Sequence, residues 1–161
     1  MWRKKVRFLI PLFLAVIMTA APAGGVFAAG RDDLPGSGKK GSFVSVNACY
    51  RRLNAMRKEA GRKVLKKDGK LAKKARIRAK EIVRRFSHTR PDGRSSLSMI
   101  PVKKAAGENI ASGQTSCGEV MRGWYRSKTH RENMLDSDFQ RVGIAGYHYR
   151  GVIYWVQLFS S

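Results

Sequence analysis

The segment 151–159 constrains the fold of this chain more than any other feature. It reads Gly-Val-Ile-Tyr-Trp-Val-Gln-Leu-Phe, and its β-branched and aromatic residues predict a strand that is apolar on both faces. Such a strand is shielded from water only when it lies centrally in a sheet that is covered on both sides. Residues 141–149 predict a second strand, and Tyr149-Arg150-Gly151 joins the two strands as a hairpin.

An amphipathic helix is expected over residues 45–60, ahead of the hairpin. Its apolar side chains recur at the spacing of one helix face, and Gly61 ends it. These side chains are Cys49, Leu53, Met56 and Ala60.

A second helix is expected from Asp68, which can cap it, to Phe86. One of its faces is apolar and includes Phe86, and the other is dense in lysine and arginine.

A third helix follows the capping box of Ser116 and Glu119 and continues to about Ser127. Residues 95–106 have room for one short helix. Helices first and a sheet last predict an α+β domain with helices on both sides of the sheet.

The first 28 residues have the three parts of a secretory signal peptide. A basic start is followed by the apolar run 8–21 and by small residues up to Ala28, where cleavage is expected. The alternative is a membrane anchor, but the apolar run is short against the roughly 20 residues of a span. We therefore expect a signal peptide over 1–28, a flexible linker over 29–42, a folded domain over 43–161, and a secreted protein.

The chain carries a formal net charge of +22, from 33 Lys and Arg against 11 Asp and Glu. Removal of the four basic residues of segment 1–28 leaves +18. Such a surface attracts polyanions. Outside a cell these are anionic lipid headgroups, wall polymers and nucleic acid, although no motif predicts specific nucleic-acid binding. The basic face of the second helix is either such an anion-binding surface or simply a solvated one.

Three short polar segments hold the candidate chemistry. Two of the three histidines lie in them, His88 and His130, together with Glu108. Histidine and carboxylate transfer protons near neutral pH and bind first-row metals. The three segments are 86–94, 107–110 and 129–135.

These segments and their neighbours resemble the CAP superfamily of cysteine-rich secretory, antigen 5 and pathogenesis-related proteins, whose domain is also called SCP. The resemblance is strongest to the bacterial extracellular branch and covers about residues 45–160. It is carried, in order, by FSHTRPDGR, GENIASG, EVMRGWYRS, THRENML, FQRVGIAGY and YWVQLF. It implies a three-layer α-β-α sandwich.

The resemblance also implies a cleft with two histidines and two acids. By motif, three corners of this cleft are His88, Glu108 and His130, while the position of the second acid is occupied by Ser127. Glu119 is acidic but lies two helical turns away, about 12 Å along the helix, and suits the capping box better.

Two functions from different classes follow from these residues. The first is a non-enzymatic, monomeric binding module, with a small ligand in the cleft and a basic surface for anionic wall polymers or lipids. The alternative is a metal-dependent extracellular hydrolase, in which His88 and His130 hold Zn²⁺ and Glu108 ligates it or orients an imidazole. Whether the protein is an enzyme stays open at this point.

Cys49 and Cys117 lie on the apolar faces of the first and third predicted helices. Outside the cytosol two such cysteines either form a disulfide or remain buried thiols. The sequence leaves both alternatives open.

Overall fold

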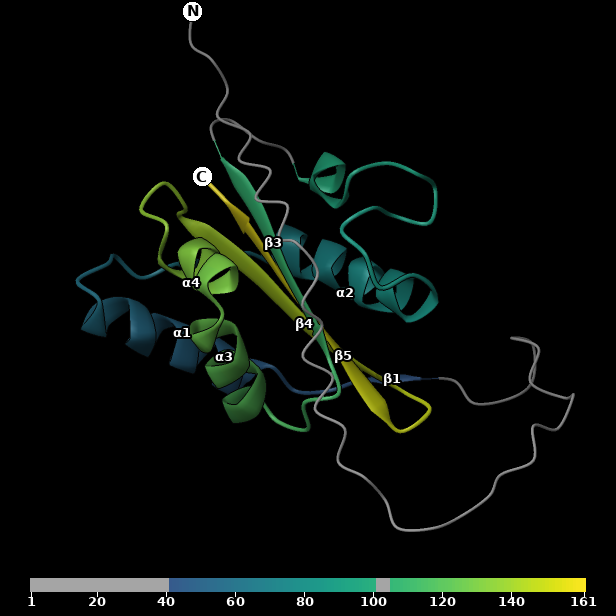
Figure 1. The fold of residues 1–161 in the computed structure, drawn as a ribbon. Coiled ribbons are helices and arrows are strands. Elements are labelled where there is room, and N and C mark those ends of the chain that lie inside the picture. Colours follow the sequence, from purple (N-terminus) through teal and green to yellow (C-terminus); the bar gives the residue numbers. More distant parts are fainter. Residues whose placement is uncertain (1–40, 101–104) are drawn as a thin grey trace, which may run out of the picture.

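The computed structural model describes residues 41–100 and 105–161 (Figure 1). The predicted signal peptide and nearly all of the predicted linker lie outside these residues. Within them, no helix is both long enough and apolar enough to span a bilayer. The elements are β1 (Ser42–Phe43), α1 (Asn47–Glu59), β2 (Lys66–Lys67), α2 (Gly69–Arg84), a 3-10 helix (Ser96–Met99), β3 (Ala106–Ser112), α3 (Cys117–Arg126), α4 (Lys128–Leu135), β4 (Arg141–Tyr149) and β5 (Val152–Ser160).

The five described strands form one sheet in the order β1-β4-β5-β3, with β2 paired in parallel to β4. The hairpin of β4 and β5 is its centre, with Arg141 opposite Ser160 and Tyr149 opposite Val152. β3 lies antiparallel on the other side of β5. The central place predicted for the last strand is therefore confirmed.

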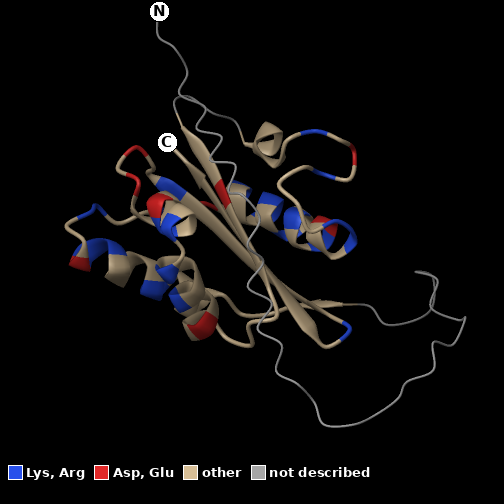
Figure 2. Ribbon diagram, in the orientation of Figure 1, with Lys and Arg blue, Asp and Glu red and all other residues tan. Residues whose placement is uncertain are grey.

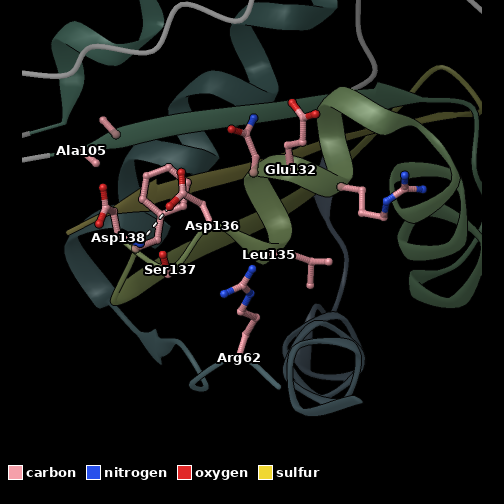
Figure 3. A pocket seen from close by; sticks show the side chains of 11 residues that line it. Arg62, Ala105, Glu132, Leu135, Asp136, Ser137 and Asp138 are labelled. Carbon is pink, nitrogen blue, oxygen red and sulfur yellow. Dashed lines mark hydrogen bonds between the residues drawn. The ribbon is translucent and has the colours of Figure 1, made fainter. Parts of the chain in front are cut away.

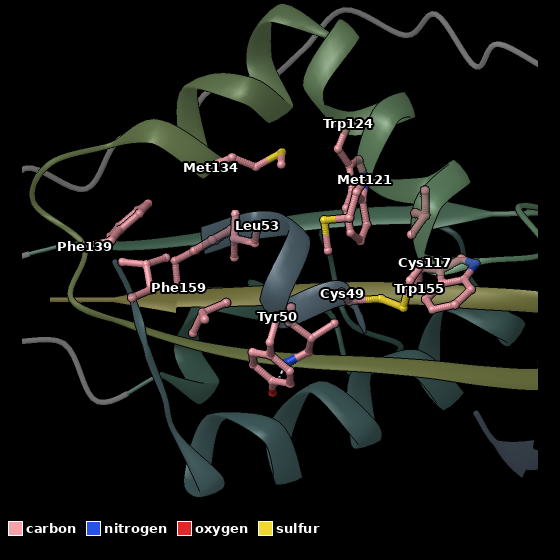
Figure 4. Packing of buried hydrophobic residues seen from close by; sticks show 14 of the residues in the cluster. Cys49, Tyr50, Leu53, Cys117, Met121, Trp124, Met134, Phe139, Trp155 and Phe159 are labelled. Carbon is pink, nitrogen blue, oxygen red and sulfur yellow. Dashed lines mark hydrogen bonds between the residues drawn. A yellow bond between two sulfur atoms is a disulfide. The ribbon is translucent and has the colours of Figure 1, made fainter. Parts of the chain in front are cut away.

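Helices cover both faces of the sheet, which confirms the three-layer α-β-α architecture (Figure 1). Alternate residues of β5 point to opposite layers. Trp155 and Phe159 pack beneath α1, α3 and α4, whereas Val156 and Leu158 pack against α2. Figure 4 shows the first of these cores, in which Trp124 of α3 is also almost fully buried.

α2 lies directly on β4, and a glycine permits this close approach. A Cβ atom at Gly143 would overlap the backbone of Leu71 and Ala72. The strand is therefore in contact with the helix backbone at this point, and any larger residue would push the two elements apart.

The expected helices are present, with corrected ends. α2 ends at Arg84, because Arg85 has an extended backbone. Phe86, expected on its apolar face, therefore lies beyond the helix with 48% of its surface exposed. The short helix expected within 95–106 is confirmed.

The capping box at α3 is formed only in part. The Ser116 hydroxyl accepts a hydrogen bond from the Glu119 backbone N–H, as expected. The Glu119 carboxylate accepts hydrogen bonds from the Thr115 backbone N–H and hydroxyl. Glu119 is thus used at the helix start and lies outside the candidate site.

A disulfide joins Cys49 of α1 to Cys117 of α3, with the two Cα atoms 4.9 Å apart (Figure 4). Both cysteines are buried. The structure thus decides between the two alternatives that the sequence left open, and the bridge fixes the starts of two helices of the same layer.

Loss of this disulfide should lower the free energy of unfolding by about 2–4 kcal/mol, because the bridge restricts the unfolded chain. It joins residues that are 68 positions apart. Urea unfolding with and without reductant measures the effect. The variant Cys49→Ala/Cys117→Ala is the control and should not respond to reductant. Equal midpoints for the oxidised and reduced protein would contradict the prediction.

Candidate functional site

The segment around Glu108 forms the edge strand β3, which the sequence did not predict. Its centre, Gly107 to Ile110, is buried. Because successive side chains of a strand point to opposite faces, Glu108 points toward α2 and Asn109 toward α3 and α4. This alternation places the candidate residues on two faces of the sheet.

The Glu108 carboxylate is almost fully buried and is hydrogen-bonded to Arg78 and His88. Arg78 of α2 donates through Nε to Oε2 at 2.8 Å and through Nη2 to Oε1 at 3.3 Å. The Nδ1 atom of His88 lies 2.8 Å from Oε1. Burial alone would raise the pKa of Glu108, but the bonds and charges of His88 and Arg78 hold it below its ordinary value.

Arg78 is the main residue that sequence reasoning missed. It is fully buried, yet it lies in a helix full of exposed cations. A signal was available, because Leu71, Ala75, Arg78 and Ile82 follow the i, i+4, i+7, i+11 spacing of the buried face. A charged residue at such a position needs a buried partner.

A second carboxylate extends this network to the loop that carries His88. Glu81 accepts a hydrogen bond from Arg78 Nη1 at 2.7 Å and from Arg90 Nη2, also at 2.7 Å. Arg90 also pairs with Asp92. Arg78 Nη2, which also donates to Glu108, donates to the Ser87 carbonyl oxygen at 2.8 Å. These bonds hold segment 87–92 against α2 and so position His88, whose side chain is 44% exposed.

His130 lies in α4, a helix that the sequence did not predict, on the opposite side of β3. Its Nδ1 atom is 2.8 Å from the Ser127 hydroxyl oxygen. Ser127 is the N-cap residue of α4, but its hydroxyl makes no capping bond. Burial, and to a lesser degree the charge of His88, lowers the pKa of His130 to about 4. The imidazole is therefore neutral at pH 7.

Amide side chains join β3 to α4. Asn109 Nδ2 donates to the His130 carbonyl oxygen at 3.1 Å and to Gln157 Oε1 at 3.0 Å. Asn133 Nδ2 donates to Asn109 Oδ1 at 2.9 Å and to the Glu108 carbonyl oxygen at 3.3 Å. Both asparagines thus donate hydrogen bonds to backbone carbonyl oxygens of the candidate site.

The structure thus brings the four predicted residues together as two pairs on either side of the edge strand. His88 is paired with Glu108, and His130 with Ser127. The effect of His88 on the pKa of His130 links the two pairs. Both oxygens of Glu108 already have partners. Among the described residues, no three His, Cys, Asp or Glu side chains are placed to hold a metal ion.

A pocket of about 370 Å³ is lined in part by the end of α4 and the loop that follows it (Figure 3). Charges of both signs line it, including Arg62, Arg131 and Asp136. It shares Asn133 with the amide network. His88, Glu108, Ser127 and His130 are not among its lining residues.

Comparison with known proteins agrees with this architecture. The CAP family, described as the cysteine-rich secretory protein family, matches residues 50–159. This chain belongs to the CAP family. The match contains His88, Glu108, Ser127 and His130, so the candidate site lies within the family's own domain.

Two of the similar proteins come from Bacillus species. YkwD of Bacillus subtilis (strain 168) is 38% identical over 112 residues, which is 66% of this chain and 43% of YkwD. This chain thus spans less than half the length of that relative. An extracellular protein with an SCP domain from Bacillus anthracis (strain Ames) is 26% identical, with a TM-score of 0.61 over 70% of this chain and 38% of that one.

A further similar structure is that of an outer surface protein of Borrelia burgdorferi. Its TM-score is 0.65 at 21% identity, over 74% of this chain and 97% of the Borrelia protein. At that identity the likeness supports the fold alone.

Substitution of Arg78 by methionine should lower the free energy of unfolding by about 3–5 kcal/mol, because it leaves the buried Glu108 charge without its main partner. Urea unfolding measures the loss. Lys73→Met is the matched control on the exposed side of α2 and should change stability by less than about 0.5 kcal/mol. Adding Glu108→Gln should recover part of the loss. An Arg78→Met variant as stable as the control would refute this account of the pair.

Acid should destabilise the CAP domain through His130. Between pH 6.5, the ordinary histidine pKa, and about pH 4, this histidine binds a proton in the unfolded chain but stays neutral in the folded protein. The contribution of neutral His130 to the free energy of unfolding is fully present above pH 6.5. About 3 kcal/mol of it is lost by pH 4. Glu108 acts in the same direction at lower pH, because its folded pKa lies below its ordinary value.

Urea unfolding at pH 7, 5.5 and 4 measures this effect, and a His130→Gln variant should show a flatter dependence over this range. The ring resonances of His130, assigned by their loss in that variant, should titrate near pH 4. A midpoint above pH 6 would contradict the prediction.

Proposed function

We propose that this CAP domain is an exported, non-enzymatic binding module that attaches to anionic wall polymers or lipid headgroups through its basic surface. The net charge, +18 without the predicted signal peptide, carries the proposal. Figure 2 shows basic positions on both helical layers. Export is supported by the predicted signal peptide over residues 1–28 and by the similarity to the extracellular SCP-domain protein of Bacillus anthracis.

The protonation states at the site support binding rather than catalysis. A general acid or base works best when its pKa is near the operating pH. The pKa of His130 is lowered to about 4, so this imidazole is a weak base. Glu108 remains ionised and its oxygens are already bonded to Arg78 and His88. The exposed His88 and the neutral His130 are suited to hydrogen bonding with a small polar ligand.

The alternative is a metal-dependent hydrolase that uses His88, Glu108 and His130. A catalytic zinc centre usually has three protein ligands and an open position. The described residues do not fit that centre, because Glu108 is engaged by Arg78 and His88. His88 and His130 would then be the only protein ligands from this set, which favours weak zinc binding.

Salt should release the protein from anionic surfaces. Retention on cell walls that carry anionic polymer should be high at about 0.05 M salt and should fall at least tenfold at about 0.5 M, because screening weakens exposed charges. Walls stripped of the polymer are the control. Retention that does not change with salt would refute the electrostatic part of the proposal. One zinc ion retained through dialysis, together with turnover lost on chelation, would instead favour the hydrolase.

A further inference from the structure

The outer side of α2 carries a row of cations that the described domain does not use for its own ion pairs. Lys73, Arg76, Lys80 and Arg84 lie on about one quarter of the helix circumference, opposite the buried face. Successive members are three or four residues apart, about 4.5–6 Å along the axis. No acid of the described chain pairs with any of them. Glu81 of the same helix is held by Arg78 and Arg90.

Aromatic rings lie beside this row and hold its two central members. Phe43 of β1 is opposite Tyr147 of β4, and their ring centroids are 5.0 Å apart. The Arg76 guanidinium lies 4.0 Å from the Phe43 centroid. Lys80 Nζ lies 5.5 Å from the Phe43 ring and 5.7 Å from the Tyr147 ring. Cations held over rings lose less conformational entropy when a ligand binds than cations that are free in solvent.

The orientation of α2 favours a polymer over a bilayer. A helix that binds a membrane surface inserts its apolar face into the lipid. The apolar face of α2 is occupied, because Leu71, Ala75 and Ile82 are buried against the sheet. Its outer side presents charge, with Ile77 as a single half-exposed apolar residue. The row has about one cation per helical turn, so its positive charges can pair with successive phosphate groups of an extended polymer chain.

We propose that this surface, the α2 face, binds a polyol-phosphate polymer and that Arg76 and Lys80 make its central phosphate contacts. The inference rests on the proposed function and narrows it to one surface and one class of ligand. The α2 face consists of Lys73, Arg76, Lys80, Arg84, Phe43 and Tyr147.

The test compares two variants that lose the same charge from opposite layers. The first is Arg76→Gln/Lys80→Gln. The control is Arg52→Gln/Arg122→Gln, which removes two exposed arginines of α1 and α3. That pair is also clustered, since both guanidinium groups come within 3.5 Å of the position that a Cβ on Gly118 would occupy.

The probes are poly(glycerol phosphate) of one defined length and phosphatidylglycerol vesicles, compared at equal accessible phosphate over a range of salt. The α2-face variant should bind the polymer at least about tenfold more weakly. The negative slope of log affinity against log salt should become shallower by about 1.4, as for two lost contacts to a single-stranded polyanion. The control should lose less than about threefold. Phe43→Leu, which keeps every charge, should lose about threefold with an unchanged slope.

The outcomes separate this inference from the proposed function. Equal losses in the two charge variants would overturn the assignment to the α2 face and leave general attraction to polyanions intact. Tighter binding to vesicles than to polymer would overturn the choice of ligand. An unaltered protein that binds neither probe would overturn the proposed function as well. Thermal unfolding of each variant establishes that the comparison is made between folded proteins.

Discussion

The contact between the Arg78 guanidinium and the Glu108 carboxylate is the interaction on which the site depends. It joins α2 to the edge strand β3, and the two side chains are 0% and 2% exposed. Removing two such charges from water costs several kcal/mol for each ion, and only good geometry with further hydrogen bonds compensates for it. Those bonds come from Glu81, the Ser87 carbonyl oxygen and His88. The pair is therefore also the point at which the loop of His88 is attached to the sheet.

The other side of the same strand explains how His130 is placed. An edge strand has backbone groups that no neighbouring strand satisfies. The carbonyl oxygens of Glu108 and Ile110, two residues apart, accept hydrogen bonds from Asn133 and from the Trp124 indole. α3 and α4 therefore protect the edge of β3, and the link from Asn109 to the His130 carbonyl fixes the histidine in the same arrangement. Protection of the strand and assembly of the site depend on the same contacts.

Sequence reasoning succeeded where one local rule dominates and failed where a distant partner decides the structure. The segment 151–159 was predictable as a central strand because both of its faces are apolar. β3 was not, because Glu108 and Asn109 interrupt its apolar pattern and their partners, Arg78 and His130, come from other elements. The helix α4 was missed for a similar reason. Its eight residues are mostly polar, and its end is held by Arg57 of α1, which donates to the carbonyl oxygens of Met134 and Asp136. The motifs alone located the four candidate site residues, but their division into two pairs required the register of β3.

The serine at position 127 explains why burial sets the direction of the pKa shift of His130. A carboxylate close to an imidazole stabilises its charged form and raises its pKa. The resemblance to the family implies an acid at this position, whereas Ser127 offers His130 a neutral hydroxyl at 2.8 Å. Among the described residues no carboxylate opposes the effect of burial, so the pKa of His130 falls to about 4. The site therefore contains one imidazole paired with a carboxylate and one that is neutral at pH 7, and the proposed binding of a polar ligand at this site rests on this asymmetry.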